Sequence, residues 1–330
     1  MKLVHSADLH LGRAFSSLTS QMAEIRREEL WLALENQVDY CLDQGISYLL
    51  LTGDIFEQDY TGYFDLKRFA SIVSPIDHVI VIKGNHDYRL GAIEGENIHL
   101  IDDIEVLEFP KDHLTVYGLS WTGPLEPDLG RLRDLDVLGD GYKVCLLHGD
   151  FQASDFQKAE DFFKKMDYVA LGHIHKAGQL TDRAYYPGSP EPLDISEEGD
   201  HGFLKVDLRP LRVEKISKTK RKCHRLVLKD EDSYPSHWSE KYGLNQEDFY
   251  ELTLVGAKKL DLNEKLIQSF FHKNSYQVKI IDQRERQEEA LDFMEREDIL
   301  GDLYRSLSKE EGPLGHRARE LFIDLTKEVL

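Results

Sequence analysis

The sequence predicts an α/β protein whose first domain holds two packed sheets flanked by helices. Short aliphatic and β-branched runs alternate with helical patterns, as is typical of a largely parallel sheet. Further strands at His113–Ser120 and Gly202–Asp207 exceed what one open sheet needs, so we expect two sheets. The runs that are apolar enough to be buried on both faces are Lys2–Ser6, Tyr48–Thr52, His78–Lys83, Lys143–Leu147 and Tyr168–Leu171.

Helices are predicted between these strands. From Met22 to Gln44 apolar residues recur with the helical period, and Gly45 follows as a stop signal. The pattern changes beyond residue 208, where a strand–helix–strand pattern precedes two amphipathic helices, Gln287–Ser308 and Gly315–Leu330. We therefore expect domains at residues 1–208 and 209–284 and a helical tail at residues 285–330.

Composition limits the class of protein. The chain has 330 residues, of which 41% are hydrophobic, and this is typical of a folded globular protein. The N-terminus lacks the apolar run of a signal peptide, and no stretch is long enough to span a membrane. Three widely spaced cysteines, Cys41, Cys145 and Cys223, are typical of buried thiols in a reducing compartment. We expect a cytoplasmic protein without membrane association.

The charge is unevenly distributed along the chain. The net charge of −20 argues against a protein that coats nucleic acid with its whole surface. However, residues 205–229 contain ten basic and two acidic residues. Such a stretch is either a local patch for phosphate groups or a solvated strand edge, and the net charge excludes neither.

Polar clusters follow each of the five buried strands. In α/β sheets the ligand crevice lies beyond the carboxyl ends of the strands, so these clusters should converge. Their residue types coordinate divalent metals through oxygen and imidazole nitrogen, and Asp-x-His and His-x-His place two side chains on one side. A single such motif is usually incidental, but five in series predict a metal centre. The clusters are Asp8-Leu9-His10, Gly53-Asp54, Gly84-Asn85-His86-Asp87, His148-Gly149-Asp150 and Gly172-His173-Ile174-His175.

These motifs, in this order, resemble the calcineurin-like metallophosphoesterase superfamily. Two further stretches, HSADLHLGRAF at the N-terminus and YYPGSPEPLDISEEGDHGF at Tyr185–Phe203, resemble one branch of it, the bacterial SbcD and YhaO exonucleases. That branch is related to the Mre nuclease of double-strand-break repair. The resemblance implies a four-layer metallophosphoesterase sandwich, a small α+β capping domain and a helical C-terminal tail.

The resemblance also implies a ligand set and a catalytic acid. Two manganese ions would be held, with Asp54 as the bridging ligand, and His86 would act as the acid near the leaving oxygen. A two-ion centre of this kind can activate water and clamp an in-line displacement at phosphorus. The first ion would be held by Asp8, His10 and His175, and the second by Asn85, His148 and His173.

Glu57 departs from the pattern of the relatives. The Mre and SbcD nucleases commonly carry histidine at this position, and phosphatases of the superfamily carry aspartate. We therefore predict that the Glu57 carboxylate lies within hydrogen-bonding distance of a His86 ring nitrogen and supports catalysis. The alternative is a side chain that points to solvent from a polar loop.

The predicted function is a manganese-dependent DNA exonuclease, a phosphodiesterase that acts in DNA repair by two-metal hydrolysis. DNA as the substrate rests on the resemblance and on the basic stretch, in which we predict DNA contacts at Lys218, Lys220, Arg221 and Lys222. The alternatives are a small-molecule phosphodiesterase or phosphatase, favoured by Glu57 and the acidic charge, and a catalytically silent scaffold. The resemblance further implies an SMC-like coiled-coil ATPase (SbcC-type) that docks on the C-terminal helices, and it leaves a homodimer open.

Overall fold

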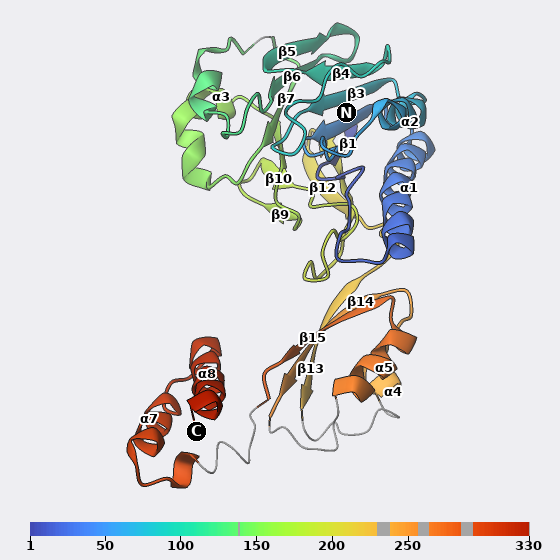
Figure 1. Cartoon of the computed structure of the whole chain (residues 1–330). Coiled ribbons are helices and arrows are strands. Elements are labelled where there is room, and N and C mark those ends of the chain that lie inside the picture. The colour runs from blue at the N-terminus through green and yellow to red at the C-terminus, as the bar shows by residue number, and fades with distance from the viewer. Residues whose placement is uncertain (138, 230–237, 257–263, 285–292, 330) are drawn as a thin grey trace. The chain divides into compact units, whose positions relative to one another are not determined.

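The computed structural model describes residues 1–137, 139–229, 238–256, 264–284 and 293–329 (Figure 1). The chain divides into two compact units, Met1–Lys220 and Arg221–Leu330.

The first unit contains two sheets in its described residues. Their strand orders are β12-β11-β1-β2-β3-β4 and β5-β6-β7-β8-β10-β9, with six strands in each. The neighbours from β1 to β4 are parallel, as are those from β6 through β8 to β10. The strands are β1 (Lys2–Ser6), β2 (Tyr48–Thr52), β3 (His78–Ile82), β4 (Ile98–Ile101), β5 (Ile104–Phe109), β6 (Leu114–Leu119), β7 (Tyr142–His148), β8 (Tyr168–Gly172), β9 (Gly178–Gln179), β10 (Ala184–Tyr186), β11 (Phe203–Leu208) and β12 (Leu211–Ile216).

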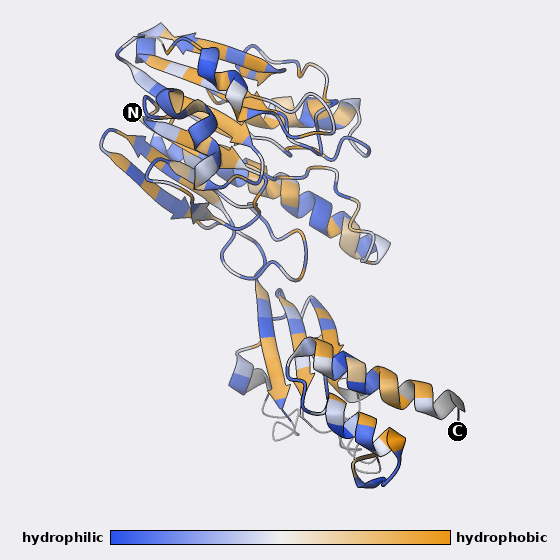
Figure 2. Ribbon diagram, turned by 90° about the vertical axis from the view of Figure 1, so that its left-hand side faces the viewer, coloured by the Kyte–Doolittle hydropathy of each residue, from blue (hydrophilic) through white to orange (hydrophobic). Residues whose placement is uncertain are grey.

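The helical segments of the first unit are α1 (Ser20–Gln44), α2 (Tyr63–Val73), η1 (Pro110–Asp112), η2 (Leu129–Asp134), η3 (Ala153–Ala159) and α3 (Glu160–Phe163). Residues of α1 and α2 pack on the outer face of the first sheet, and residues of η2, η3 and α3 pack on that of the second. Leu50 of one sheet and Leu146 of the other share a core between the sheets, while Leu49 and Leu147, on the opposite faces, belong to two outer cores. Because central strands such as β2 and β7 are buried on both faces, each can serve two cores (Figure 2). This arrangement confirms the predicted four-layer sandwich.

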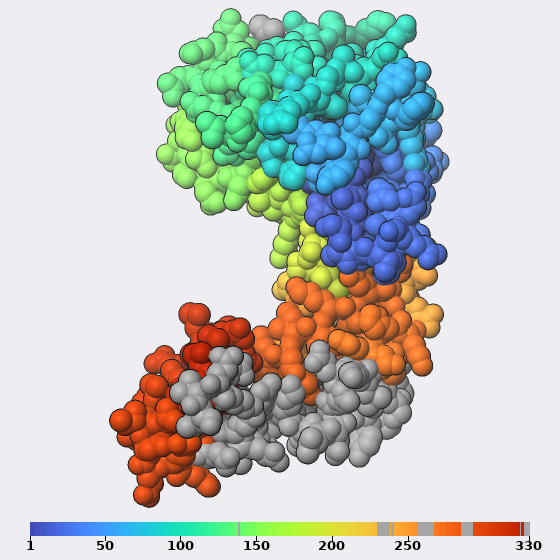
Figure 3. All heavy atoms as spheres, in the orientation of Figure 1, coloured from blue at the N-terminus to red at the C-terminus, as the bar shows by residue number. Residues whose placement is uncertain are grey.

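The predicted helix signals for α1 are present at both ends. Thr19 caps the N-terminus through the amide of Met22, and Gly45 ends the helix in the left-handed conformation with φ of 62°. Helices α1 and α2 lie side by side on the first unit (Figure 3), where Arg68 of α2 pairs with Glu28 of α1 at 2.7 Å.

The first unit extends further along the chain than the expected end at residue 208. Strand β12 pairs with β11 in an antiparallel hairpin from Phe203↔Ile216 to Leu208↔Leu211. It therefore continues the sheet of the first unit, which ends at Lys220. We expected the boundary at residue 208, before the end of the first unit, because the basic residues of β12 resemble those of the following segment.

The second unit begins with a parallel three-stranded sheet of order β13-β14-β15. Leu252 of β14 and Phe271 of α5 lie in its core. The sequence predicts strands at Phe249–Val255 and Tyr276–Ile281 with a helix at Leu262–Phe271 between them, and this order of elements is present. Residues 262 and 263 lie outside the described residues. The elements are β13 (Cys223–Lys229), α4 (Trp238–Tyr242), β14 (Phe249–Val255), α5 (Glu264–Asn274) and β15 (Gln277–Asp282).

The tail forms a helical pair, α7 (Ile299–Leu307) and α8 (Pro313–Val329), joined by a small core around Tyr304 and Phe322. The expected helix Gln287–Ser308 is not continuous in its described part, because the side chain of Asp298 caps a new N-terminus at Ile299. Residues 287–292 lie outside the described residues.

Two composition-based expectations can be compared with the structure. Cys41, Cys145 and Cys223 are buried and are not joined in disulfides. In the part of the chain that the structure describes, no helix is both long and apolar enough to cross a bilayer.

Candidate metal centre

The polar clusters after β1, β2, β3, β7 and β8 meet at the carboxyl ends of the strands. The segments that follow β1 and β2 run together, with the amide of Asp8 donating to the carbonyl of Gly53 at 3.1 Å. The amide of His173, after β8 of the other sheet, donates to the Asp8 carboxylate at 3.0 Å. The centre therefore lies where the two sheets bring their strand ends together, as the sequence predicted.

Among the described residues, three groups of donor atoms are close enough to hold an ion, and two of them match the predicted ligand sets. Asp8, His10 and His175 form one, and Asp54, His148 and His173 form the other, with the donor atoms of each group within 4.8 Å of one another. Oδ2 of Asp54 lies 3.7 Å from Nε2 of His10 and 3.4 Å from Nε2 of His148. Asp54 therefore lies between the groups, where a carboxylate can bridge two ions.

Asn85 completes the second group. Its side-chain oxygen lies 3.1 Å from Nε2 of His148 and 3.0 Å from Nδ1 of His173. All seven predicted ligands are thus brought together by the fold. The set of carboxylate and amide oxygens with imidazole nitrogens suits a divalent transition metal.

The environment of these residues fits a cation. Nε2 of His10 is buried and has no hydrogen-bond partner, although an unpaired buried polar atom is costly. Asp8 is fully buried, and burial raises the pKa of its carboxyl group. Burial alone would lower the pKa of His148, but the charge of Asp54, the hydrogen bond to it and the charge of Asp8 together outweigh burial and raise the pKa to about 9. The site favours positive charge, which two metal ions would supply.

Backbone strain is concentrated at the predicted ligands. Four of the seven adopt positive φ without being glycine: Asp8 at 56°, His10 at 48°, Asp54 at 52° and His173 at 100°. Such conformations cost free energy and tend to persist where the surrounding structure imposes them. Here they turn the chain at each strand end so that the side chains face the centre.

Glycine at two strand ends is required by close packing. A Cβ atom on Gly84 would lie 2.3 Å from Oδ1 of Asp54 and 2.7 Å from Nε2 of His148. A Cβ atom on Gly172 would lie 1.9 Å from the carbonyl of Thr52. Both glycines therefore let the ligands approach one another.

Asp87 supports two of the turns that carry predicted ligands. Its Oδ2 accepts from the amide of Ile55 at 2.7 Å and its Oδ1 from the amide of Gly84 at 2.6 Å. Asp87 thus ties the turn after β2 to the turn after β3. The sequence analysis missed Glu197, whose Oε1 lies 2.8 Å from Nδ1 of His175, because no local motif marks it.

Glu57 contacts His86 as predicted, and it also contacts a metal ligand. Its Oε2 lies 3.0 Å from Nδ1 of His86, and its Oε1 lies 2.9 Å from Nδ1 of His10 and 3.3 Å from Arg13. Although burial of Glu57 would raise the pKa of its carboxyl group, the hydrogen bonds from His10 and His86 outweigh burial and hold that pKa well below its usual range. The hydrogen bond to Glu57 raises the pKa of His86.

The predicted DNA contacts differ in their exposure. Lys218, Lys220 and Lys222 are exposed, whereas Arg221 is only 4% exposed. The Arg221 guanidinium lies 3.4 Å from the centre of the Tyr276 ring and donates to the carbonyl of Glu247 at 2.6 Å. A buried guanidinium engaged in this way has a structural role, so we remove Arg221 from the predicted contacts.

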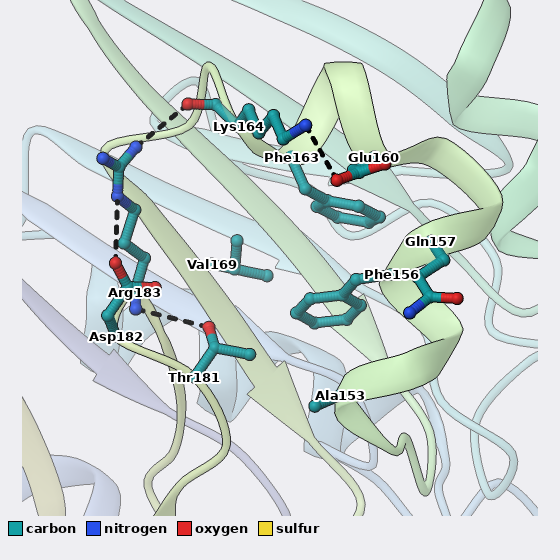
Figure 4. Close-up of a pocket in the computed structure, with 10 residues that line it drawn as sticks. All are labelled: Ala153, Phe156, Gln157, Glu160, Phe163, Lys164, Val169, Thr181, Asp182 and Arg183. Carbon is teal, nitrogen blue, oxygen red and sulfur yellow. Dashed lines mark hydrogen bonds and ion pairs between the residues drawn. The ribbon is translucent and has the colours of Figure 1, made fainter.

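A cavity of about 370 Å³ lies elsewhere, on the outer side of the second sheet (Figure 4). The stacked rings of Phe156 and Phe163 form one wall. Lys164 on its rim pairs with Glu160 at 2.7 Å, and Arg183 donates to the carbonyl of Lys164 at 3.0 Å. The described lining residues include none of the predicted metal ligands, so the cavity is separate from the metal centre.

The fold and the paired ligand groups define the class of metal-dependent phosphoesterases. Residues 1–177 match the family model of the calcineurin-like phosphoesterases. The chain belongs to this family, as its motifs predicted.

Several curated relatives lie in the predicted branch. The chain is 28% identical to the metallophosphoesterase YhaO of Bacillus subtilis (strain 168) in an alignment of 232 residues that covers 62% of this chain and 57% of YhaO. It is 24% identical to the DNA double-strand break repair protein Mre11 of Thermoplasma acidophilum in an alignment of 302 residues that covers 77% of this chain and 76% of that protein. The chain thus spans little more than half the length of YhaO.

Solved structures give weaker similarities. TT1561 of Thermus thermophilus has a TM-score of 0.39 and 14% identity, and the match covers 65% of this chain and 98% of TT1561. A dimetal phosphatase from Danio rerio has a TM-score of 0.38 and 14% identity, with 63% of this chain and 92% of the phosphatase covered.

Proposed function

We propose that the chain is a manganese-dependent DNA exonuclease that hydrolyses phosphodiester bonds in DNA repair. The observation that carries the phosphodiesterase assignment is the position of Asp54 between two complete ligand groups, with His86 beside them. A catalytically silent scaffold would have no use for this set, so we set that alternative aside.

The seven predicted ligands would hold the two ions between them. Asp8, His10 and His175 would hold one ion, Asn85, His148 and His173 the other, and Asp54 both. The bound ions would supply Lewis-acid activation of the phosphoryl group and of water. The backbone amide of His86 donates to Oδ1 of Asp54 at 2.8 Å, which fixes His86 next to the bridging ligand.

His86 supplies the proton for the leaving oxygen in this proposal. Its side chain is 43% exposed, so a substrate can reach it. Glu57 accepts from Nδ1, which leaves Nε2 as the atom that donates. The carboxylate stabilises the imidazolium and raises the pKa of His86, so the acid keeps its proton to a higher pH than it would without Glu57.

DNA as the substrate is supported by relatives and by charge. The Mre11 relatives are named as DNA double-strand break repair proteins. The exposed residues Lys218, Lys220 and Lys222 lie in the segment that joins the two units and would contact backbone phosphates.

A small-molecule phosphodiesterase or phosphatase is the second candidate. Glu57 and the net charge of −20 favour it, because both disfavour a polyanionic substrate. End-labelled linear duplex and a chromogenic phosphodiester should be compared under manganese, magnesium and chelator. Manganese-dependent release of nucleotides from the duplex ends supports the exonuclease; cleavage of the chromogenic diester alone selects the second candidate.

The tail would bind an SMC-like coiled-coil ATPase. Several apolar side chains of α7 and α8 are exposed in the described residues, among them Ile299 at 83% and Leu314 at 86%. An exposed apolar surface of this kind suits a helical partner. Truncation after Arg284 should abolish co-purification with that ATPase, and light scattering of the full chain will decide whether it is a homodimer.

A further inference from the structure

The stretch Tyr185–Phe203 resembles the nuclease branch, yet none of the predicted ligands or catalytic residues lies in it. The structure gives this stretch a contact with the metal centre. Oε1 of Glu197 lies 2.8 Å from Nδ1 of His175, and both side chains are largely buried. Because Glu197 accepts from Nδ1, the proton of the imidazole is held there and Nε2 is left as the ligand atom.

The loop itself holds the Glu197 carboxylate in place. Oε2 of Glu197 accepts from the amide of Leu193 at 2.8 Å and from Oγ of Ser189 at 3.5 Å. The ring of His201 spans the loop, with Nε2 3.0 Å from the carbonyl of Glu197 and Nδ1 3.0 Å from Oγ of Ser189. These contacts leave the carboxylate little freedom to move away from His175.

The backbone of the loop is also joined to that of His175. The amide of Ser189 donates to the carbonyl of His175 at 3.0 Å. Gly188 has φ of 76°, and a Cβ atom there would lie 2.7 Å from the same carbonyl. The loop and the ligand therefore form one packed unit.

The two ligand groups differ in how their histidines are supported. In the group of Asp8, His10 and His175, Nδ1 of each histidine donates a hydrogen bond to a carboxylate. His10 donates to Glu57, and His175 donates to Glu197. In the other group, Nδ1 of His148 lies 2.8 Å from a backbone carbonyl, that of Thr52. A carboxylate acceptor makes the imidazole a more basic ligand than a carbonyl does.

We propose that Glu197 is a positioning residue for the ion held by Asp8, His10 and His175, and that it sets the affinity of that ion through His175. The inference rests on the proposed two-ion function. The affinity of that ion would then depend in part on a loop that contributes none of the seven ligands.

Calorimetric titration of the full chain with manganese tests this inference. Glu197→Ala should weaken the binding of one of the two manganese ions by about 10–100-fold and leave the affinity for the other ion unchanged. Glu197→Gln keeps an acceptor but loses the charge, so its affinity should fall between those of the parent and Glu197→Ala. Glu198→Gln is the matched control, since Glu198 is exposed on the same loop. His173→Ala should instead weaken the binding of the other ion.

Thermal unfolding in chelator should give the same midpoint for Glu197→Gln and the parent, which shows that the loop is folded. Two unchanged affinities in both Glu197 variants would overturn the role of Glu197 while leaving the two-ion function standing. Failure of the parent to bind manganese would overturn the proposed function and this inference together.

Discussion

Glu57 and His86 form a carboxylate–imidazole pair, with Oε2 3.0 Å from Nδ1. The other oxygen of the same carboxylate lies 2.9 Å from Nδ1 of the ligand His10. One carboxylate thus supports both the proposed acid and a metal ligand. The structure therefore joins Glu57 to both His86 and His10.

Glu57→Gln should slow turnover and move the alkaline limb of the pH–rate profile to lower pH. The acid form of His86 is the imidazolium, and the hydrogen bond to Glu57 raises the pKa of His86. Without the carboxylate that pKa falls, so the imidazolium is lost at a lower pH. The profile should be measured at saturating manganese, so that weaker support of His10 does not contribute. An alkaline limb at the same pH as in the parent would show that Glu57 does not support His86 as the acid.

His86→Ala should bind two ions but turn over about 10²–10⁴-fold more slowly, as expected for loss of a general acid. Metal content and kcat should be measured on the same preparation. His86 also lies in a potential ligand group with His10 and Asp54, so the metal measurement is decisive. Loss of an ion would assign His86 as a ligand.

Gly84→Ala should abolish tight metal binding. The added Cβ would lie 2.3 Å from Oδ1 of Asp54, and the backbone turn leaves little room for adjustment. Gly91→Ala is the matched control, because a Cβ on Gly91 meets no heavy atom within 4 Å. Manganese binding that survives in Gly84→Ala would show that the described spacing of Asp54 and His148 is not required.

Replacing Lys218 and Lys222 with glutamine should weaken duplex binding and flatten its dependence on salt. The slope of log K against log salt should fall by about one for each lysine–phosphate interaction that is removed. Lys2→Gln serves as the control, since Lys2 is exposed at the opposite end of β1 from the metal centre. An unchanged slope would reduce the basic stretch to a solvated surface.

The convergence of the predicted ligands could be anticipated from the sequence because local patterns determine it. A short apolar run such as Tyr48–Thr52, followed by glycine, favours a buried strand, and the polar residues at its end then face the crevice. Long-range pairing was harder to predict. β12 is amphipathic and basic, and its membership of the first sheet depends on its register with Phe203–Leu208.

The contacts of two single side chains could not be predicted from the sequence either. Arg221 stands in a basic run, which favours exposure, but the Tyr276 ring that covers it lies far along the chain. Glu197 is one acidic residue among several in its loop, and only the folded loop selects it to face His175. Neither relationship follows from spacing.

The central claim, a two-ion centre that shares Asp54, is tested most directly by calorimetric titration of Asp54→Ala with manganese. Asp54 lies between the Nε2 atoms of His10 and His148 and would be the common ligand. The parent should bind two ions, and Asp54→Ala should bind neither tightly while keeping its fold by circular dichroism. Binding of two ions to Asp54→Ala with the affinities of the parent would contradict the account.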